Sequence, residues 1–123
     1  MKLSDQVEAA TGADRELDAL IGVAIGRFRA EPNKGWLDRL DYIEIRDDGV
    51  QCHPGNGFDQ LVPHYTAGIY AALTLVPEGG YPAAVLLQAI NYCDMADPEQ
   101  TPSAFIARLP AFICAAALRA RGL

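Results

Sequence analysis

The chain has 123 residues, of which half are apolar and 21% are charged, so it can bury about two thirds of its unfolded surface in one core. Its formal net charge is −6 with only 10 lysines and arginines, which excludes a general electrostatic affinity for nucleic acid. No apolar run approaches the ~20 residues of a membrane helix, and no signal sequence follows Lys2. We therefore expect a soluble cytoplasmic protein with a single domain over residues 1–123.

Residues 1–12 are polar and rich in small side chains, which predicts a flexible N-terminal end. Thr11 and Asp14 have the spacing of a helix capping box. Apolar residues then recur at helical spacing, which predicts a helix that starts at Asp14 and ends near Ala30, ahead of Pro32. Its apolar stripe consists of Leu17, Leu20, Ile21, Ala24 and Phe28.

Residues 41–54 are typical of a β-hairpin. A two-residue turn at Asp48-Gly49 would pair Ile45 with Cys52. This register keeps the apolar side chains on one face, which consists of Ile43, Ile45, Val50 and Cys52. The outward positions are Tyr42, Glu44, Arg46 and Gln51.

A central helix is predicted between Thr66 and Val76. Thr66 can cap its first turn, Pro63 keeps the preceding residue extended, and Pro77 with Gly79-Gly80 ends it. Its apolar stripe needs a sheet to cover, and consists of Ile69, Ala72, Leu73 and Val76.

The segment from Pro82 to Asp94 has two interpretations. Its alanines and leucines favour a helix, whereas the alternation of Val85, Leu87, Ala89 and Asn91 favours a strand. We favour the strand, because the preceding Gly79-Gly80-Tyr81 is a poor helix start.

The C-terminal part predicts two helical pieces. Thr101-Pro102-Ser103 begins the first, Leu109-Pro110 interrupts it, and the second runs from Pro110 to about Arg121. The predicted fold is therefore α+β. A small antiparallel sheet, made of the hairpin and one or two further strands, is covered by about three helices that start near Asp14, Thr66 and Pro110.

Four local patterns resemble the small phage and prophage proteins grouped as the phage ABA sandwich domain. They are Arg15–Ile21, Pro63–Thr66 with Ile69 and Ala71–Leu73, Val76–Gly79, and Pro110 with Cys114–Ala120. The resemblance implies a helix-flanked sheet in a phage-encoded protein of the host cytoplasm, and it assigns no activity to any residue. The family often continues Pro-Glu-Gly with an aromatic residue and two strands, whereas this chain has one obvious strand there.

The metal-ligating residue types do not have the spacing of a metal site. Cys52, His64 and Cys93 are ligand types that zinc prefers, but no C-x-x-C or H-x-x-x-H pair is present. Three widely spaced cysteines also do not form a disulfide framework, so we expect reduced, structural thiols, although His64 could reach Cys93 across the fold. The sequence therefore predicts no metal, no cofactor and no catalytic residue.

Carboxylates gather in two places, at residues 38–48 and at residues 94–99. Such clusters are ordinary on a solvated rim, but they can also present negative charge to a basic protein groove. In the second case the candidate partner-binding residues are Trp36, Asp41, Tyr42, Glu44, Asp47 and Asp48.

Three functions remain open. The first is a non-enzymatic phage accessory protein that binds a host protein with a basic surface and inhibits a nucleic-acid-binding defence complex, as an anti-CRISPR does. The second is an assembly component of a phage particle, which would favour a homo-oligomer with an apolar patch near Trp36, Tyr70 and Tyr81. An enzyme is the third and the least favoured, because the two histidines and two serines have no catalytic spacing. A homodimer is compatible with the first two.

Overall fold

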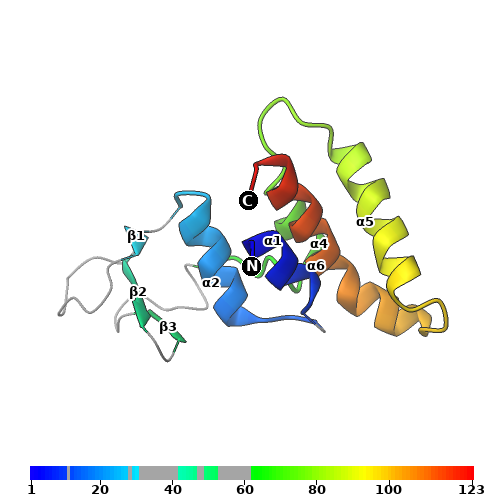
Figure 1. Cartoon of the computed structure of the whole chain (residues 1–123), viewed down its shortest axis with the longest axis horizontal. Helices are drawn as coiled ribbons and strands as arrows, with labels where there is room; N and C mark the ends of the chain where they lie inside the picture. The colour runs from blue at the N-terminus through cyan, green and yellow to red at the C-terminus, as the bar shows by residue number, and fades with distance from the viewer. Residues whose placement is uncertain (11, 28, 31–41, 47–48, 53–61) are drawn as a thin grey trace. The chain divides into compact units, whose positions relative to one another are not determined.

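The computed structural model describes residues 1–10, 12–27, 29–30, 42–46, 49–52 and 62–123. The chain divides into two compact units, one formed by residues 1–14 and 64–123 and the other by residues 15–63 (Figure 1). The first unit is therefore built from two segments of the chain, and the second unit is inserted between them.

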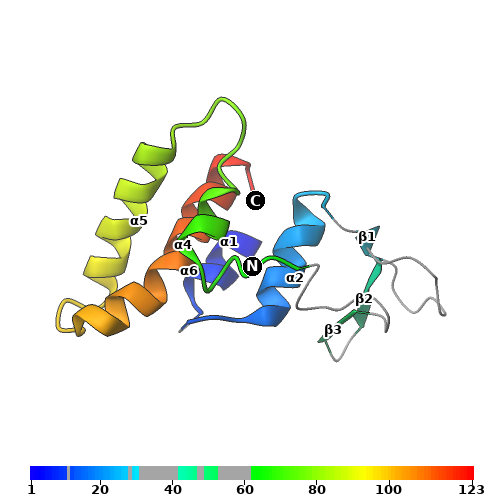
Figure 2. The same ribbon diagram turned by 180° about the vertical axis from the view of Figure 1, so that it is seen from behind.

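The first unit is a group of helices organised around α6 (Pro102–Ala120). Helices α1 (Leu3–Glu8), α4 (Ile69–Leu73) and α5 (Pro82–Ala96) each contact α6 (Figures 1 and 2). The residues of α6 from Leu109 to Leu118 are all buried. This long buried run makes α6 the core element.

Helix α1 lies where the sequence suggested a flexible end. Val7 is fully buried, and the main-chain amide of Ser4 donates to the carbonyl of Leu123 at 3.4 Å. Arg119 of α6 forms ion pairs with Asp5 at 2.9 Å and with Glu8. Tertiary contacts with the end of α6 therefore order a segment whose local sequence is only a weak helix signal.

Helix α6 begins as predicted, because Thr101 is its N-cap and its hydroxyl accepts a hydrogen bond from the Ala104 amide at 3.2 Å. The predicted interruption at Pro110 is wrong, since α6 continues through this residue. A proline inside a helix costs about 3 kcal/mol, and burial of the surrounding run from Leu109 to Leu118 offsets that cost. By length and composition α6 is the one described helix that could cross a membrane, and buried core helices meet the same criteria.

The predicted strand between Pro82 and Asp94 is also wrong, because these residues belong to α5. Pro82 is the first residue of the helix, a position where its missing amide is not needed. Val85, Ala89 and Cys93 are buried at four-residue spacing, which is the period of a helix packed along one face. The period-two alternation that suggested a strand has no structural role.

The central helix is shorter than predicted, since α4 spans only Ile69–Leu73 and its N-cap is Gly68. Thr66 does not cap it. Instead its hydroxyl accepts from the Asp14 amide at 2.8 Å and donates to the Asp14 carbonyl at 3.2 Å. This fully buried threonine therefore joins the two segments of the first unit.

The turn after α4 depends on two adjacent glycines. Gly79 has φ +83°, a conformation that favours glycine. A Cβ on Gly80 would lie 2.9 Å from the carbonyl oxygen of Pro77, which already accepts from the Gly80 amide at 2.8 Å. The backbone therefore has no room for a side chain at Gly80.

We expect Gly80→Ala to lower the free energy of unfolding by about 1–3 kcal/mol, because the new methyl group must displace backbone. The matched control is Gly12→Ala, where an added Cβ would meet nothing within 4 Å and the change should stay within ~0.5 kcal/mol. Urea unfolding midpoints measure both. Equal midpoints for the two variants would contradict the crowding at Gly80.

The second unit contains α2 (Arg15–Ala24) and three short strands, β1 (Arg29–Ala30), β2 (Tyr42–Arg46) and β3 (Gly49–Cys52). The start of α2 agrees with the prediction, but the helix ends before Ala30. The amides of Gly26 and Arg27 donate to the carbonyls of Val23 and Gly22, and Gly26 has φ +82°. This is a Schellman motif, and it ends the helix.

The hairpin is present with a different register. Strand β2 pairs antiparallel with β3 and parallel with β1. Ile45 pairs with Val50 rather than with Cys52, and Arg46 pairs with Gly49, so the predicted turn at Asp48-Gly49 is wrong. The side chains of these strands lie outside the described part, and the apolar face of Ile43, Ile45, Val50 and Cys52 stays a prediction.

The α+β fold class is wrong. In the described residues the protein is all-α in its core, with five α-helices, and the buried side chains lie in these helices or in the segments directly before and after α4. Helices α1, α4 and α5 each pack on α6 rather than on a sheet. The predicted sheet needs the segment from Pro82 to Asp94 as a strand, whereas this segment is helical and packs on α6.

Candidate protein-binding surface

An apolar recess lies in the first unit between the end of α4 and the start of α5. It has a volume of about 360 Å³ and is lined by Tyr70, Leu73, Thr74 and Pro82. The Tyr70 side chain is 91% exposed, and Tyr81, next to Pro82, is 77% exposed. Exposed aromatic side chains beside an apolar recess are the residues that anchor protein interfaces.

Two of the arginines in the first unit are engaged within the protein. Arg119 pairs with Asp5 and Glu8. Burial lowers the pKa of Arg119, but the hydrogen bonds and charges of these two carboxylates together outweigh it and raise the pKa. The Arg121 guanidinium donates to the Leu75 carbonyl at 2.7 Å.

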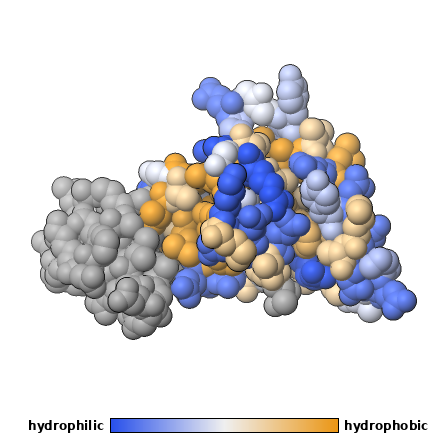
Figure 3. Space-filling view, viewed as in Figure 1, coloured by the Kyte–Doolittle hydropathy of each residue, from blue (hydrophilic) through white to orange (hydrophobic). Residues whose placement is uncertain are grey.

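Four exposed carboxylates form no ion pair with any residue in the described part of the chain: Glu78, Asp94, Asp97 and Glu99. Hydrophilic side chains gather over the loop that joins α5 and α6 (Figure 3). The surface of this unit is therefore acidic as well as apolar.

The two described thiols are buried. The Cys93 thiol donates to the Phe105 carbonyl at 3.7 Å, and the Cys114 thiol donates to the Tyr65 carbonyl at 3.1 Å. Burial raises the pKa of Cys93, the charge of Arg108 opposes the rise and that of Asp94 adds to it. Because the thiol and not the thiolate is favoured, Cys93 is poorly suited to nucleophilic attack or metal binding.

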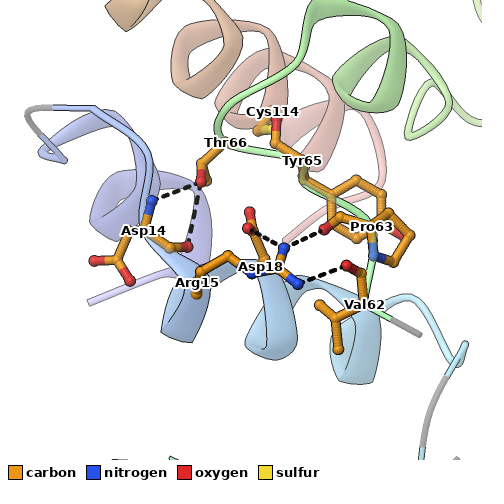
Figure 4. Close-up of polar contacts among 8 residues, drawn as sticks. All are labelled: Asp14, Arg15, Asp18, Val62, Pro63, Tyr65, Thr66 and Cys114. Atoms are coloured by element: carbon orange, nitrogen blue, oxygen red, sulfur yellow. Dashed lines mark hydrogen bonds and ion pairs between the residues drawn. The ribbon is translucent and has the colours of Figure 1, made fainter. Parts of the chain in front are cut away.

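The buried polar contacts near the boundaries of the two units have a structural role. Within the second unit, the Arg15 guanidinium points toward Asp18, at 2.8 Å, and donates to the carbonyls of Val62, at 2.8 Å, and Pro63, at 3.2 Å (Figure 4). Arg15 thus links the first helix of this unit to its last two residues. We call this set of contacts the Arg15 clamp.

The sequence-predicted site residues fall largely outside the described residues. Trp36, Asp41, Asp47 and Asp48 do so entirely, and only the backbone of Tyr42 and Glu44 is described, in β2. Of the possible zinc ligands, His64 is exposed and Cys93 is buried in α5, while the side chain of Cys52 is not among those described. No group of three or more His, Cys, Asp or Glu residues in the described ranges could hold a metal ion.

Comparisons of the chain with protein-family models, with curated proteins and with solved structures find no match. The resemblance to the phage ABA sandwich domain therefore stays a prediction. The site rests on the geometry of the first unit alone.

The sequence indicates Tyr70 and Tyr81 for the apolar patch of an assembly component, but sequence reasoning missed the apolar residues exposed on the neighbouring helices. Leu87 is 63% exposed, Met95 71% and Ile106 61%. A signal was available, since the segment from Pro82 to Ala96 contains a single charged residue, Asp94. A surface helix normally carries more charge on its outer face.

Proposed function

We propose that this protein acts by stoichiometric binding of another protein, a host protein with a basic surface. The observation that carries the proposal is the apolar recess between α4 and α5, with the exposed Tyr70 and Tyr81 beside it. Two tyrosines at an apolar recess offer contact area to a partner at a low cost in side-chain entropy. The net charge of −6 directs such a surface toward a basic partner.

The finer proposal is an accessory protein of a phage that blocks a nucleic-acid-binding defence complex in the host cytoplasm. The resemblance to the phage family and the acidic composition support it. In this proposal the carboxylates of Asp41, Glu44, Asp47 and Asp48 occupy the basic groove, and Trp36 or Tyr42 adds an aromatic anchor.

In the first step of the test, the tagged protein is used to recover its partner from a host lysate. The partner is then purified. Partner binding is then measured against salt concentration for the wild type and for a hairpin variant with Asp41→Asn, Glu44→Gln, Asp47→Asn and Asp48→Asn. A control variant with Glu78→Gln, Asp94→Asn, Asp97→Asn and Glu99→Gln removes the same charge elsewhere. Both variants should associate more slowly.

Only the hairpin variant should also dissociate faster, because only its carboxylates are expected to be desolvated in the complex. We expect Tyr70→Ser with Tyr81→Ser to weaken binding by roughly tenfold or more, the scale of interface anchors, with Tyr92→Ser as the tyrosine control. If the wild type, the hairpin variant and the control have the same dissociation rate and the same salt slope, the acidic-hairpin mechanism is refuted. An unchanged affinity in the double tyrosine variant would refute the role of the recess.

An assembly component of a phage particle is the second candidate. The exposed Leu87 and Met95 on α5, together with Tyr70 and Tyr81, favour it, because subunits of an assembly bury such side chains against each other. A stable oligomer larger than a dimer at low micromolar concentration would support this function over the first.

A further inference from the structure

The outer face of α5 differs from an ordinary solvated helix surface. Val85, Ala89 and Cys93 are buried on the inner face, and α5 contacts α6. At 100° per residue the opposite side presents a stripe, which we call the α5 stripe and which consists of Ala84, Leu87, Asn91 and Met95. All four residues are exposed, Leu87 by 63% and Met95 by 71%.

We propose that the α5 stripe binds the α5 stripe of a second copy of this chain, with the two helices antiparallel. This self-association goes beyond the proposed binding of a host protein, and it requires neither the recess nor the hairpin. It names the contact that Leu87 and Met95, which also favour the assembly candidate, would make. Three features of the helix favour a second copy as the occupant, namely the sizes of the side chains, the position of the charge and the uncapped N-terminus.

The side-chain sizes are complementary when the stripe is turned end to end. A twofold axis at the middle of the stripe, between Leu87 and Asn91, places Met95 of each copy over Ala84 of the other. It also places Leu87 beside Asn91 of the other copy. Large side chains thus meet small or adaptable ones, which is how packed helix faces interdigitate.

Charge and capping favour the same arrangement. Helix α5 has no side-chain cap at its N-cap Tyr81 and no acidic residue in its first turn, so its first amides keep their partial positive charge. In the antiparallel dimer Asp94 of each copy lies near the first turn of the other α5. A parallel pairing would instead bring the two Asp94 carboxylates together.

A basic partner would gain little from this stripe, because Asp94 is the only charged residue in the fifteen positions of α5. The size of the stripe also sets the expected strength. The helix is about 22 Å long, and one pair of such helices buries less than the ~1,200 Å² of a standard stable interface. We therefore expect a dimer with a dissociation constant in the micromolar range, on the order of 10–100 μM.

The first experiment is sedimentation velocity of the full chain between roughly 1 μM and 1 mM, a range that brackets this dissociation constant. The wild type should shift from monomer to dimer, and the variant Leu87→Lys with Met95→Lys should weaken the dimer at least tenfold. Tyr70→Lys, at a more exposed aromatic residue outside the stripe, should dimerise like the wild type. Circular dichroism must show the same helix content in all three proteins.

The second experiment tests orientation in a Cys52→Ser background, in which the two other thiols are buried. Ala84→Cys and Met95→Cys chains are oxidised separately and as an equal mixture at high concentration. The antiparallel dimer predicts a covalent dimer mainly in the mixture, because the two engineered positions face each other only across copies. A wild type that stays monomeric, or single variants that cross-link with themselves as well as the mixture does, would overturn the proposal.

Discussion

Ile113→Asp should leave the first unit unfolded at 25 °C. Ile113 is fully buried near the middle of α6, among Phe112, Cys114 and the alanines that follow. A carboxylate at this position loses its hydration and gains no partner, which costs several kcal/mol, and it also removes apolar packing worth about 2–5 kcal/mol. The sum is comparable to the whole stability of a domain, about 5–15 kcal/mol. Far-UV circular dichroism and a thermal scan measure the loss.

The same substitution at Ile106, in the same helix, is the matched control. Ile106 is 61% exposed, so Ile106→Asp keeps the carboxylate hydrated and should change the free energy of unfolding by no more than ~0.5–1 kcal/mol. A folded Ile113→Asp protein, or an Ile106→Asp protein that unfolds equally, would show that the assigned inner and outer faces of α6 are wrong.

Arg15→Ala should open the second unit while the first stays folded. The Arg15 guanidinium pairs with Asp18, which is fully buried, and also bonds to the carbonyls of Val62 and Pro63. Removal of one partner of a buried ion pair typically costs about 3–5 kcal/mol. Hydrogen exchange should therefore accelerate at the amides of α2 and remain slow in the buried half of α6.

The conservative control for the Arg15 clamp is Arg15→Lys. Lysine keeps the positive charge but lacks the planar fork that reaches a carboxylate and two carbonyls together. We expect its α2 exchange rates to fall between those of the wild type and Arg15→Ala. If all three proteins exchange at the same rate, the clamp does not hold the second unit together.

The helix starts could be predicted because their signals are local. Thr101 and Pro102 begin α6 as their residue types indicate, and the start of α2 was placed within one residue. Helix α5 was missed although Val85, Ala89 and Cys93 already had a four-residue period. The preceding glycines favour a break in any helix. In the structure they form a turn, with Gly79 at φ +83°, and the helix begins directly after it at Pro82.

Other features depend on contacts that no local pattern contains. Thr66 has the residue type of a helix cap, but it bonds the backbone of Asp14, 52 positions away. Pro110 should interrupt a helix by its chemistry, yet the burial of its neighbours keeps α6 continuous. Tertiary packing overrides local propensity at both residues.

The sequence indicates Tyr70 and Tyr81 only as candidates for the apolar patch of an assembly component, not as partner-binding residues. Both are exposed beside the recess. The α5 stripe could not be foreseen once the segment was assigned to a strand, because a strand places Leu87 and Met95 on the same face as Val85 and Cys93. The hairpin carboxylates stay a prediction.

The docking of α1 on α6 also constrains when the protein can fold during its synthesis. Asp5 and Arg119 are 114 positions apart, so at ~5–20 residues per second the ribosome needs about 6–23 s to supply the partner of α1. Throughout that interval the short helix has nothing to pack against, and too few residues to persist alone. Val7 therefore remains accessible to chaperones on the nascent chain. The first unit completes its folding only after the last turn of α6 has emerged.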